Sequence, residues 1–393
     1  MNAIAVFWIF LRLGLTSFGG PIAHLGYFRE EFVARRHWLS ERSYADLVAL
    51  CQFLPGPASS QVGMAIGLSR AGFGGALAAW LGFTMPSAIA LTALAVGLSQ
   101  WGASVPPGVL HGLKLVAVAV VAQAVWGMAR LLWTDLGRIV IGVLSAAVAL
   151  AWTPVGNQLA IIAAAALCGW LLGLRATDAP HESIPIAISR RTATILLVLF
   201  VALLAGLPVL AHYWPIGMLV RATAFYRVGS TVFGGGHVVL PLLQSEVVTR
   251  GWLSTETLMT GYAAAQAVPG PLFSFAAFLG ASMSVGARAW IAGLAMLVAI
   301  FTPSFLMVAG ALPFWEQLRQ NVRAQAMFAG VNAAVVGLLL AALYRPVWTT
   351  AVLGLLDLAL VLIAFGALTI ARIPPWVVVC GSVAAGWGVG SLR

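Results

Sequence analysis

The chain is 393 residues long, 61% hydrophobic and only 8% charged, with a formal net charge of +10. A soluble globule needs a polar surface that this composition cannot supply, so the chain is expected to lie in a lipid bilayer. The positive charges are dispersed over loops and form no basic stripe interleaved with aromatic residues, which argues against a nucleic-acid partner.

Continuous apolar runs predict membrane helices along most of the chain, because crossing a bilayer takes roughly 20 apolar residues. The runs are 76–97, 113–132, 139–152, 159–174, 192–211, 289–312, 331–343 and 352–371. They lack the alternation of strands, so α-helices are the expected secondary structure. The apolar stretch before Phe18 is interrupted by Arg12 and matches an internal segment, so it is expected to remain in the mature protein.

Three motifs occur twice in the same order, which indicates an internal duplication. They are Arg-x-Gly-x-Thr-x-Phe-Gly-Gly, starting at Arg12 and Arg227; Trp-Leu-Ser, starting at Trp38 and Trp252; and Pro-Gly-Pro, starting at Pro55 and Pro269. We refer to the two sets as the first and the second copy. Two of the motifs break helices inside apolar sequence, and a duplicated, interrupted hydrophobic segment is the best sequence pointer to a transporter's binding site.

The basic residues of the loops indicate that the two copies have opposite orientations in the membrane. The loop after the first motif carries four arginines in the first copy and one in the second, whereas the neutral turn 100–109 corresponds to 316–325, which carries two arginines. Basic loops tend to stay cytoplasmic. An inversion needs an odd number of crossings between equivalent positions, and the run 192–211, which has no counterpart in the first copy, supplies the extra one.

We therefore predict an all-α polytopic membrane protein with two inverted-topology repeats, each containing broken half-helices, joined by an extra transmembrane helix. The first membrane repeat is expected over 1–174 and the inverted second repeat over 216–393. A polar cytoplasmic linker and the extra helix fill 175–215. The basic first loop places the N-terminus on the cytoplasmic side.

The Pro-Gly-Pro motifs predict an interruption at membrane depth. Pro55 and Pro57 remove two backbone donors and Gly56 permits unusual dihedral angles, so a helix cannot pass straight through. We expect 44–68 to bend into a pair of half-helices, and the consecutive glycines of the first motif to turn the first segment back. The N-terminal end of a half-helix presents unpaired N–H groups that favour an anion. A kink used only for packing is the competing interpretation, and its recurrence in both copies favours function.

Candidate substrate-binding and translocation residues lie at the breaks, among their flanking amides and hydroxyls, and at intramembrane cations. They are Arg12, Gly19, Gly20, Gln52, Pro55, Gly56, Pro57, Ser59, Ser60 and Lys114 in the first copy, and Arg227, Gly234, Gly235, Gln266, Pro269, Gly270, Pro271, Ser274 and Asn332 in the second. Intramembrane cations are costly without a partner or a wet site. Extension of the side chain to the interface is the alternative for Arg12 and Lys114.

Titratable groups of the membrane segments are few. His24, His237 and Asp357 are candidates for proton coupling. The scarcity of carboxylates disfavours a cation pathway, which would bring several of them to the midplane. The sequence contains no phosphate-binding glycine loop, zinc signature or nucleophile elbow, so no metal, cofactor or enzymatic activity is expected, and transport would be secondary.

With Phe18-Gly19-Gly20-Pro21, Trp38-Leu39-Ser40 and Gln52-Phe53-Leu54-Pro55-Gly56-Pro57, each with a partner in the second copy, the whole chain resembles the chromate ion transporter family in its long, two-domain form. The resemblance implies a bacterial inner-membrane protein that exports chromate from the cytoplasm, gives chromate resistance and uses the proton-motive force. It maps family residues onto Arg12, Gly14, Phe18, Gly19, Gly20, Pro55, Gly56 and Pro57, and onto Arg227, Gly229, Phe233, Gly234, Gly235, Pro269, Gly270 and Pro271. The second copy departs with Gly236 where the first has Pro21, and with Val268 where the first has Leu54.

The residues alone favour a tetrahedral oxyanion without reaching chromium, because chromate and sulfate are similar dianions that arginines, amides and N–H groups discriminate poorly. A sulfate or other oxyanion carrier stays open, and so, from a different class, does a passive anion channel or lipid-translocating protein. A membrane enzyme is disfavoured because the repeated motifs pair no nucleophile with a base. The expected partners are the oxyanion and the lipid bilayer, and assembly into a homo-oligomer is left open.

Overall fold

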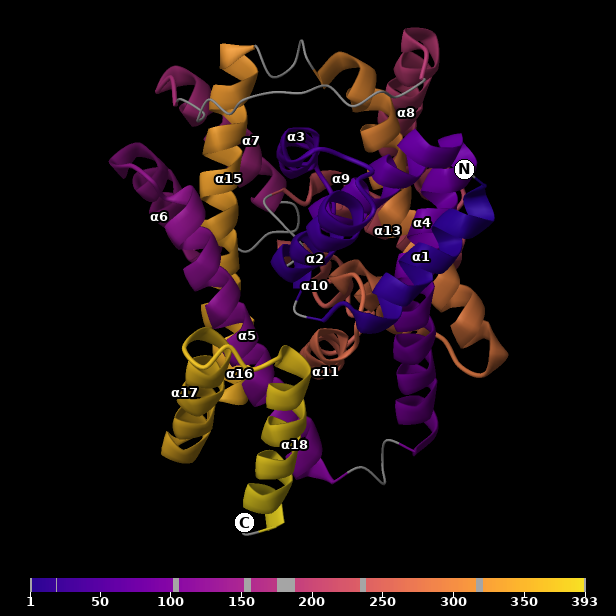
Figure 1. Ribbon diagram of the computed structural model, residues 1–393. Helices are drawn as coiled ribbons and strands as arrows, with labels where there is room; N and C mark the ends of the chain where they lie inside the picture. Colours follow the sequence, from indigo (N-terminus) through magenta and orange to yellow (C-terminus); the bar gives the residue numbers. More distant parts are fainter. Residues whose placement is uncertain are drawn as a thin grey trace.

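The computed structural model describes residues 2–18, 20–101, 106–151, 157–174, 188–233, 238–315 and 321–391, and these are folded almost entirely into helices (Figure 1). The helices up to residue 213 are α1 (Ala3–Thr16), α2 (Gly20–Arg29), a π-helical turn (Glu30–Arg35), α3 (Glu41–Phe53), α4 (Ala58–Trp101), α5 (Pro107–Leu132), α6 (Leu136–Ala151), α7 (Asn157–Leu171) and α8 (Arg190–Tyr213). The linker residues 175–187 lie outside the described residues.

The second part of the chain repeats this order after α8. Its elements are α9 (Gly217–Thr231), α10 (Val239–Val247), α11 (Thr255–Ala267), a 3-10 turn (Leu272–Ser274), α12 (Phe275–Ser282), α13 (Ala287–Ala311), a second 3-10 turn (Leu312–Phe314), α15 (Val322–Ala342), a π-helical turn (Leu343–Trp348), α16 (Thr349–Ala351), α17 (Leu355–Thr369) and α18 (Pro375–Ser391).

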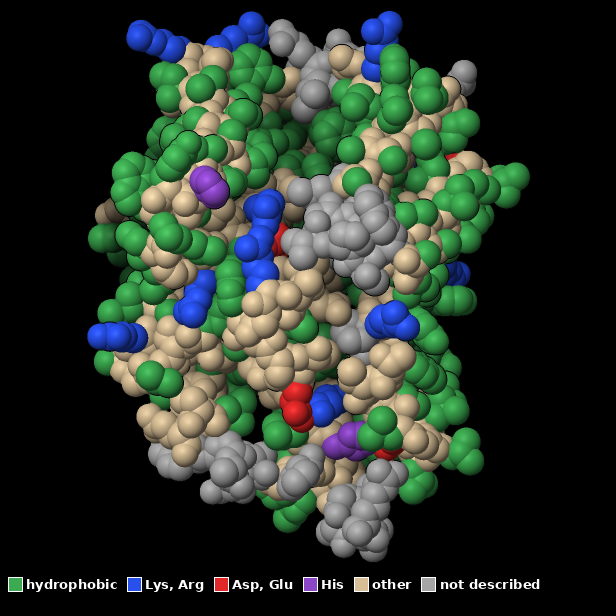
Figure 2. Space-filling view, turned by 180° about the vertical axis from the view of Figure 1, so that it is seen from behind, with side chains coloured by type: hydrophobic (Ala, Val, Ile, Leu, Met, Phe, Trp, Pro, Cys, Tyr) green, Lys and Arg blue, Asp and Glu red, His purple; other side chains and the backbone are tan. Residues whose placement is uncertain are grey.

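The helices have the length and composition of membrane spans. Five in the described part of the chain are long and apolar enough to cross a bilayer: Ala58–Gln100, Gly108–Arg130, Arg190–Tyr213, Ala287–Phe314 and Val322–Ala351. Only 6% of the apolar stretch of α8 is buried in the protein, so this helix presents its hydrophobic side chains outward. Figure 2 shows hydrophobic side chains over the outer helices on both sides of one face. The all-α polytopic membrane fold expected from the sequence is confirmed.

The helix breaks expected from the first copy are confirmed. Helix α1 ends at Thr16 and α2 begins at Gly20, and α3 ends at Phe53 before α4 begins at Ala58. Helix α4 contains a further break at Gly72, where φ is +58°. In the second copy α11 ends at Ala267, and a 3-10 turn precedes α12; Ser274 stands just before α12 and makes no capping hydrogen bond to it.

The Trp-Leu-Ser motifs fold in the same way in both copies. Ser40 caps α3 by accepting a hydrogen bond from Ser43 N at 3.1 Å, and Ser254 caps α11 by accepting one from Thr257 N at 3.1 Å. Such caps satisfy backbone donors that the first helical turn leaves unpaired. This motif therefore starts the half-helix that runs into each Pro-Gly-Pro break.

Equivalent helices of the two copies run in opposite directions. Figure 1 shows α5 beginning at the lower end of the molecule and α15 at the upper end. The copies also exchange helices, because α6 and α7 pack on α15 whereas α17 and α18 pack on α5. A Cβ at Gly330 of α15 would lie 2.1 Å from Ala165 O of α7, and one at Gly112 of α5 would lie 2.3 Å from Ser382 O of α18. Matching glycines thus allow matching close crossings of membrane helices.

Candidate functional site

The two Pro-Gly-Pro breaks cross the glycine motifs of the opposite copies. Gly56 N donates a hydrogen bond of 2.6 Å to Val232 O at the end of α9, and Gly270 N donates one of 3.0 Å to Ser17 O at the end of α1. Ser17 and Val232 occupy equivalent positions of their motifs. The reciprocal bonds join the copies at a point where neither backbone is helical.

The central glycines of the breaks adopt conformations that other residues rarely do. The φ angle is +123° at Gly56 and +108° at Gly270, a region that L side chains disfavour. A Cβ at Gly56 would lie 2.4 Å from Ser304 Oγ, and one at Gly270 would lie 2.8 Å from Ser87 Oγ. Each glycine therefore packs against a serine of the other copy.

These two serines were missed by the sequence analysis. Ser87 follows Pro86 in α4, and Ser304 follows Pro303 in α13. The signal was present in the sequence, because the Pro-Ser pair recurs at corresponding positions of two apolar runs. Both hydroxyls are almost completely buried, with 1% and 0% of the residue exposed.

Several buried polar groups beside the first break have no hydrogen-bond partner. Gln61 Nε2 donates to Pro55 O at 2.6 Å, but Gln61 Oε1 and the hydroxyls of Ser60 and Ser304 are unpaired. The three residues are at most 3% exposed, and Ser59 is buried beside them. Nearly all buried polar groups in folded proteins form hydrogen bonds. A cluster of buried polar groups without partners therefore indicates a place for water or a ligand.

The second break also has unpaired groups, but its two serines that correspond to Ser60 and Ser304 are hydrogen-bonded. Ser274 Oγ donates to Pro271 O at 2.7 Å, and Ser87 Oγ donates to Thr84 O at 3.0 Å. The Gln266 amide nitrogen has no acceptor, although the side chain hydrogen-bonds Tyr262 within α11. The hydroxyls of Ser17 and Thr84 are buried without a partner as well.

Of the three predicted cations, one is exposed and two are paired with carboxylates. Arg12 is exposed, and no carboxylate of the described residues pairs with it. Arg227 forms an ion pair with Glu246, which also binds Arg250 at 3.1 Å. Lys114 of α5 binds Glu256 of α11 at 2.6 Å, so its charge is balanced by the other copy.

The remaining predicted residues are dispersed. Gln52 is exposed, whereas Asn332 is partly buried and its Oδ1 has no partner. His24 is 1% exposed and its ring lies edge-on to Phe83 at 5.1 Å between centroids. Positions 19, 234, 235 and 237 lie outside the described residues.

Asp357 is fully buried and joins the two copies. Its Oδ1 lies 2.8 Å from Nε2 of His111 on α5, and its Oδ2 accepts a hydrogen bond from Leu353 N at 3.0 Å. Asp357 was predicted from the sequence, but its partner His111 was not. His111 is three residues before Lys114 on α5, so the two charged contacts between copies lie one helical turn apart.

Outside the apolar spans, the first copy contains the counterpart of Glu246. Glu31 binds Arg36 at 2.7 Å and Arg35 at 3.2 Å. Burial raises the pKa of the Glu31 carboxyl, but the hydrogen bonds and charges of the two arginines outweigh burial and hold this pKa below its usual value of 4.5. The carboxyl is therefore ionised at neutral pH.

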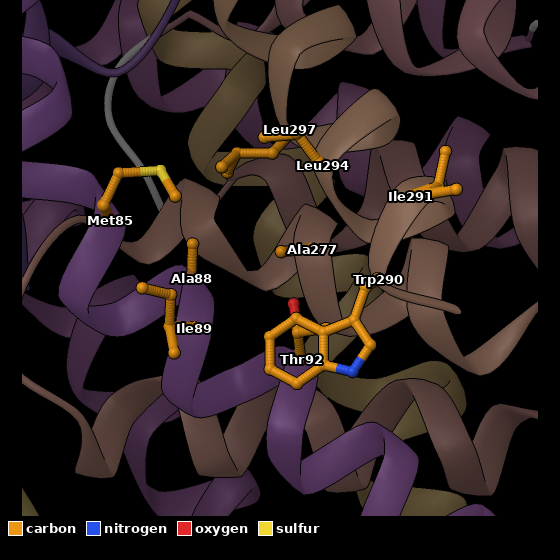
Figure 3. A pocket seen from close by; sticks show the side chains of 9 residues that line it. All are labelled: Met85, Ala88, Ile89, Thr92, Ala277, Trp290, Ile291, Leu294 and Leu297. Atoms are coloured by element: carbon orange, nitrogen blue, oxygen red, sulfur yellow. The ribbon is translucent and has the colours of Figure 1, made fainter. Parts of the chain in front are cut away.

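A cavity of about 250 Å³ lies between α4, α12 and α13 (Figure 3). Its lining is apolar except for Thr92, and Ile291 and Leu294 are 64% and 50% exposed. Such walls cannot replace the hydration of a dianion. The cavity suits hydrocarbon and is not an oxyanion site. Within the described residues, no three His, Cys, Asp or Glu side chains group as metal ligands.

The fold and the crossing define the class of protein: a duplicated polytopic membrane protein whose broken helices meet at buried, unpaired polar groups, as in secondary transporters. The chain belongs to the chromate transporter family, whose pattern matches residues 4–170 and again 219–387. The two matches confirm the duplication. Members of this family are transport proteins and not enzymes.

Relatives extend over most of the chain. A chromate transport protein of Pseudomonas aeruginosa is 27% identical over 86% of this chain and 80% of its own length. A probable chromate transport protein of Synechococcus elongatus is 27% identical over 84% and 80%. An uncharacterized transporter of Methanocaldococcus jannaschii is 27% identical over 88% and 84%. No solved structure matches the chain.

Proposed function

We propose that the protein exports chromate from the cytoplasm by alternating access, with the two copies rocking about the crossing of their Pro-Gly-Pro breaks. The observation that carries this proposal is the reciprocal pair of hydrogen bonds from Gly56 N and Gly270 N to the opposite copies. Inverted repeats that meet at broken helices form the substrate site of many secondary transporters. The two repeats of the proposal are 1–174 and 216–393, separated by the linker and α8.

The chemistry of the crossing supports an oxyanion as substrate. The N-terminal end of α4 begins at Ala58, directly after the first break, and carries the positive end of the helix dipole. The buried hydroxyls of Ser59, Ser60 and Ser304 lie beside this break. Neutral donors of this kind bind tetrahedral anions without placing a buried charge that would need its own partner.

The tight contact at the crossing supports alternation. A methyl group has no room between Gly56 and Ser304, where a Cβ would lie 2.4 Å from the hydroxyl. A tetrahedral anion is larger, so the copies move apart when it enters. The two reciprocal hydrogen bonds would then open in turn, one toward each side of the membrane.

Export is the direction that the membrane potential favours. An inside-negative potential drives each negative charge outward with about 2.3 kcal/mol per 100 mV, so a dianion needs no further driving force. The upper end of Figure 1, where α8 begins with Arg190 and Arg191, is assigned to the cytoplasm because basic residues gather there. The inner membrane of a bacterium is the proposed location, with the N-terminus on the cytoplasmic side.

Proton coupling is assigned to Asp357 and its partner His111. Their contact joins α17 to α5, and the neighbouring Lys114–Glu256 pair joins α5 to α11. Movement of α17 or α11 relative to α5 would break these contacts. A proton on His111 strengthens its pairing with Asp357, so protonation would favour the conformation in which the copies are joined.

Uptake of labelled chromate into inverted membrane vesicles tests this function. Saturable accumulation is expected, with sulfate as a weaker competitor and with faster uptake when the potential is made positive inside the vesicle. Imposing the pH gradient separately measures coupling, and Asp357→Asn should abolish its effect while uptake driven by the potential persists. Accumulation of sulfate in place of chromate would make the protein a sulfate carrier, and a non-saturable flux would indicate a channel.

A further inference from the structure

We infer that the anion site is asymmetric: one tetrahedral oxyanion binds at the Pro-Gly-Pro break of the first copy, and Ser304 of the second copy completes this site as a specificity-determining donor. The inference rests on the proposed function and names the part of the crossing that contacts the anion. The break of the second copy then serves as a hinge without an anion of its own.

The residues that follow the two breaks differ in chemistry. Pro57 is followed by Ala-Ser-Ser-Gln, whereas Pro271 is followed by Leu-Phe-Ser-Phe. Phe273 and Phe275 are buried, with 1% and 0% of each residue exposed. Phenyl rings donate no hydrogen bonds, so they cannot replace the hydration of an oxyanion. In the turn that follows each break, Ser60 has an unpaired hydroxyl, whereas the hydroxyl of Ser274 is already bonded to Pro271 O.

The hydrogen bonds at the two breaks also favour an anion at the first break. Beside the first break the hydroxyls of Ser60 and Ser304 are buried and unpaired. Beside the second break Ser274 and Ser87, which occupy the equivalent positions, donate to backbone oxygens. The unpaired hydroxyls there belong to Ser17 at the end of α1 and Thr84 in α4, and not to the turn that follows the break. Gln266 has an unpaired nitrogen, but it lies in the last turn of α11, where the dipole disfavours an anion.

Ser304 reaches the site from the opposite copy. It belongs to α13, whereas Gly56, Ser60 and Gln61 belong to the first copy. A Cβ at Gly56 would lie 2.4 Å from Ser304 Oγ and 2.7 Å from Gln61 Nε2, so both side chains pack against this glycine. An anion held between them would bind both copies at once. This arrangement couples binding to the relative position of the copies.

Ser304→Ala and its structural counterpart Ser87→Ala form a matched pair for the test. Both remove one buried hydroxyl that packs against a break glycine, but only Ser304 lacks a partner within the protein. In vesicles containing the full-length chain, Ser304→Ala and Ser60→Ala should each raise the KM for chromate about tenfold or more, because each loses a hydrogen bond to a charged ligand. Ser87→Ala should stay within about twofold of the wild type.

A specificity measurement separates contact with the anion from a structural role. The ratio of the chromate KM to the sulfate inhibition constant should change in Ser304→Ala and not in Ser87→Ala. Ser304→Cys, which keeps a weak donor of similar size, should fall between Ser304→Ala and the wild type. If gel filtration in detergent shows that Ser304→Ala does not fold, the KM ratio is measured with Ser304→Cys instead.

Equal KM values for the Ser304 and Ser87 variants would overturn the asymmetry, and so would a larger effect at Ser87. These outcomes differ from failure of the proposed function, which is detected with the wild-type protein. If the wild type transports neither chromate nor sulfate, the function is wrong. If it transports chromate while the matched variants behave alike, the function stands and the single asymmetric site is wrong.

Discussion

The two breaks have the same backbone and different side chains. Gly56 and Gly270 both adopt positive φ, both donate to the opposite copy and both pack against a serine that follows a proline. The side chains after the breaks are hydroxyls and an amide in one copy and phenyl rings in the other. After duplication, backbone geometry is kept by the need to join the copies, whereas the side chains of one half can diverge once the other half binds the ligand.

The largest expected effect comes from adding a side chain to either break. Gly56→Ala and Gly270→Ala both impose positive φ on alanine, at a cost of about 1–3 kcal/mol. The new methyl of Gly56→Ala also meets Ser304 and Gln61. We expect Gly56→Ala to abolish chromate uptake and Gly270→Ala to retain part of it when rates are divided by the amount of folded protein. Equal residual rates per folded molecule would show that the breaks contribute alike.

A second comparison concerns the shared carboxylates of the two copies. Glu246 binds two arginines whose side chains are 29% and 35% exposed, whereas Glu31 binds two that are 55% and 33% exposed. Glu246→Gln should lower the free energy of unfolding by about 2 kcal/mol, less than the roughly 3–5 kcal/mol of a fully buried pair because solvent screens the arginines. Glu31→Gln should cost about half as much.

Thermal unfolding in detergent measures this difference as a lower Tm for Glu246→Gln than for Glu31→Gln. Glu41→Gln is the control, because the Arg29–Glu41 pair is more than half exposed on both sides and should contribute little. A Tm for Glu31→Gln at or below that of Glu246→Gln would contradict the ranking.

The sequence predicted the breaks, the inversion and the extra helix, because proline, glycine and loop charge act locally or through the membrane. It could not predict that helices would be exchanged between copies or that Ser304 would meet Gly56, since these contacts depend on tertiary packing. The arginines show the same limit. Arg12 and Arg227 lie in identical motifs, but only Arg227 binds the carboxylate of its copy, Glu246. In the first copy the equivalent carboxylate, Glu31, binds Arg36, and the second copy has a glycine at the position of Arg36.

Lys114 provides a smaller test of how the copies are joined. It pairs with Glu256, whose side chain is 56% exposed, so the pair contributes at most about 1 kcal/mol. Lys114→Glu places two carboxylates together between α5 and α11 and should slow chromate uptake several-fold. Combining it with Glu256→Lys should restore most of the rate, because the pair is reformed with reversed charges. A double variant as slow as Lys114→Glu would instead show that the lysine itself serves the anion.

The smallest expected effect is the pH dependence that Glu31 gives to stability. Its pKa is below 4.5 in the folded protein, so the stability it contributes is fully present above the unfolded value and is lost as pH falls through the folded value. The Tm of the wild type should therefore decline more steeply below about pH 4.5 than that of Glu31→Gln, and the two profiles should run parallel above it. Profiles that stay parallel down to pH 3 would mean that the arginines do not stabilise the ionised carboxyl, and that the two copies share this carboxylate position without sharing its electrostatic role.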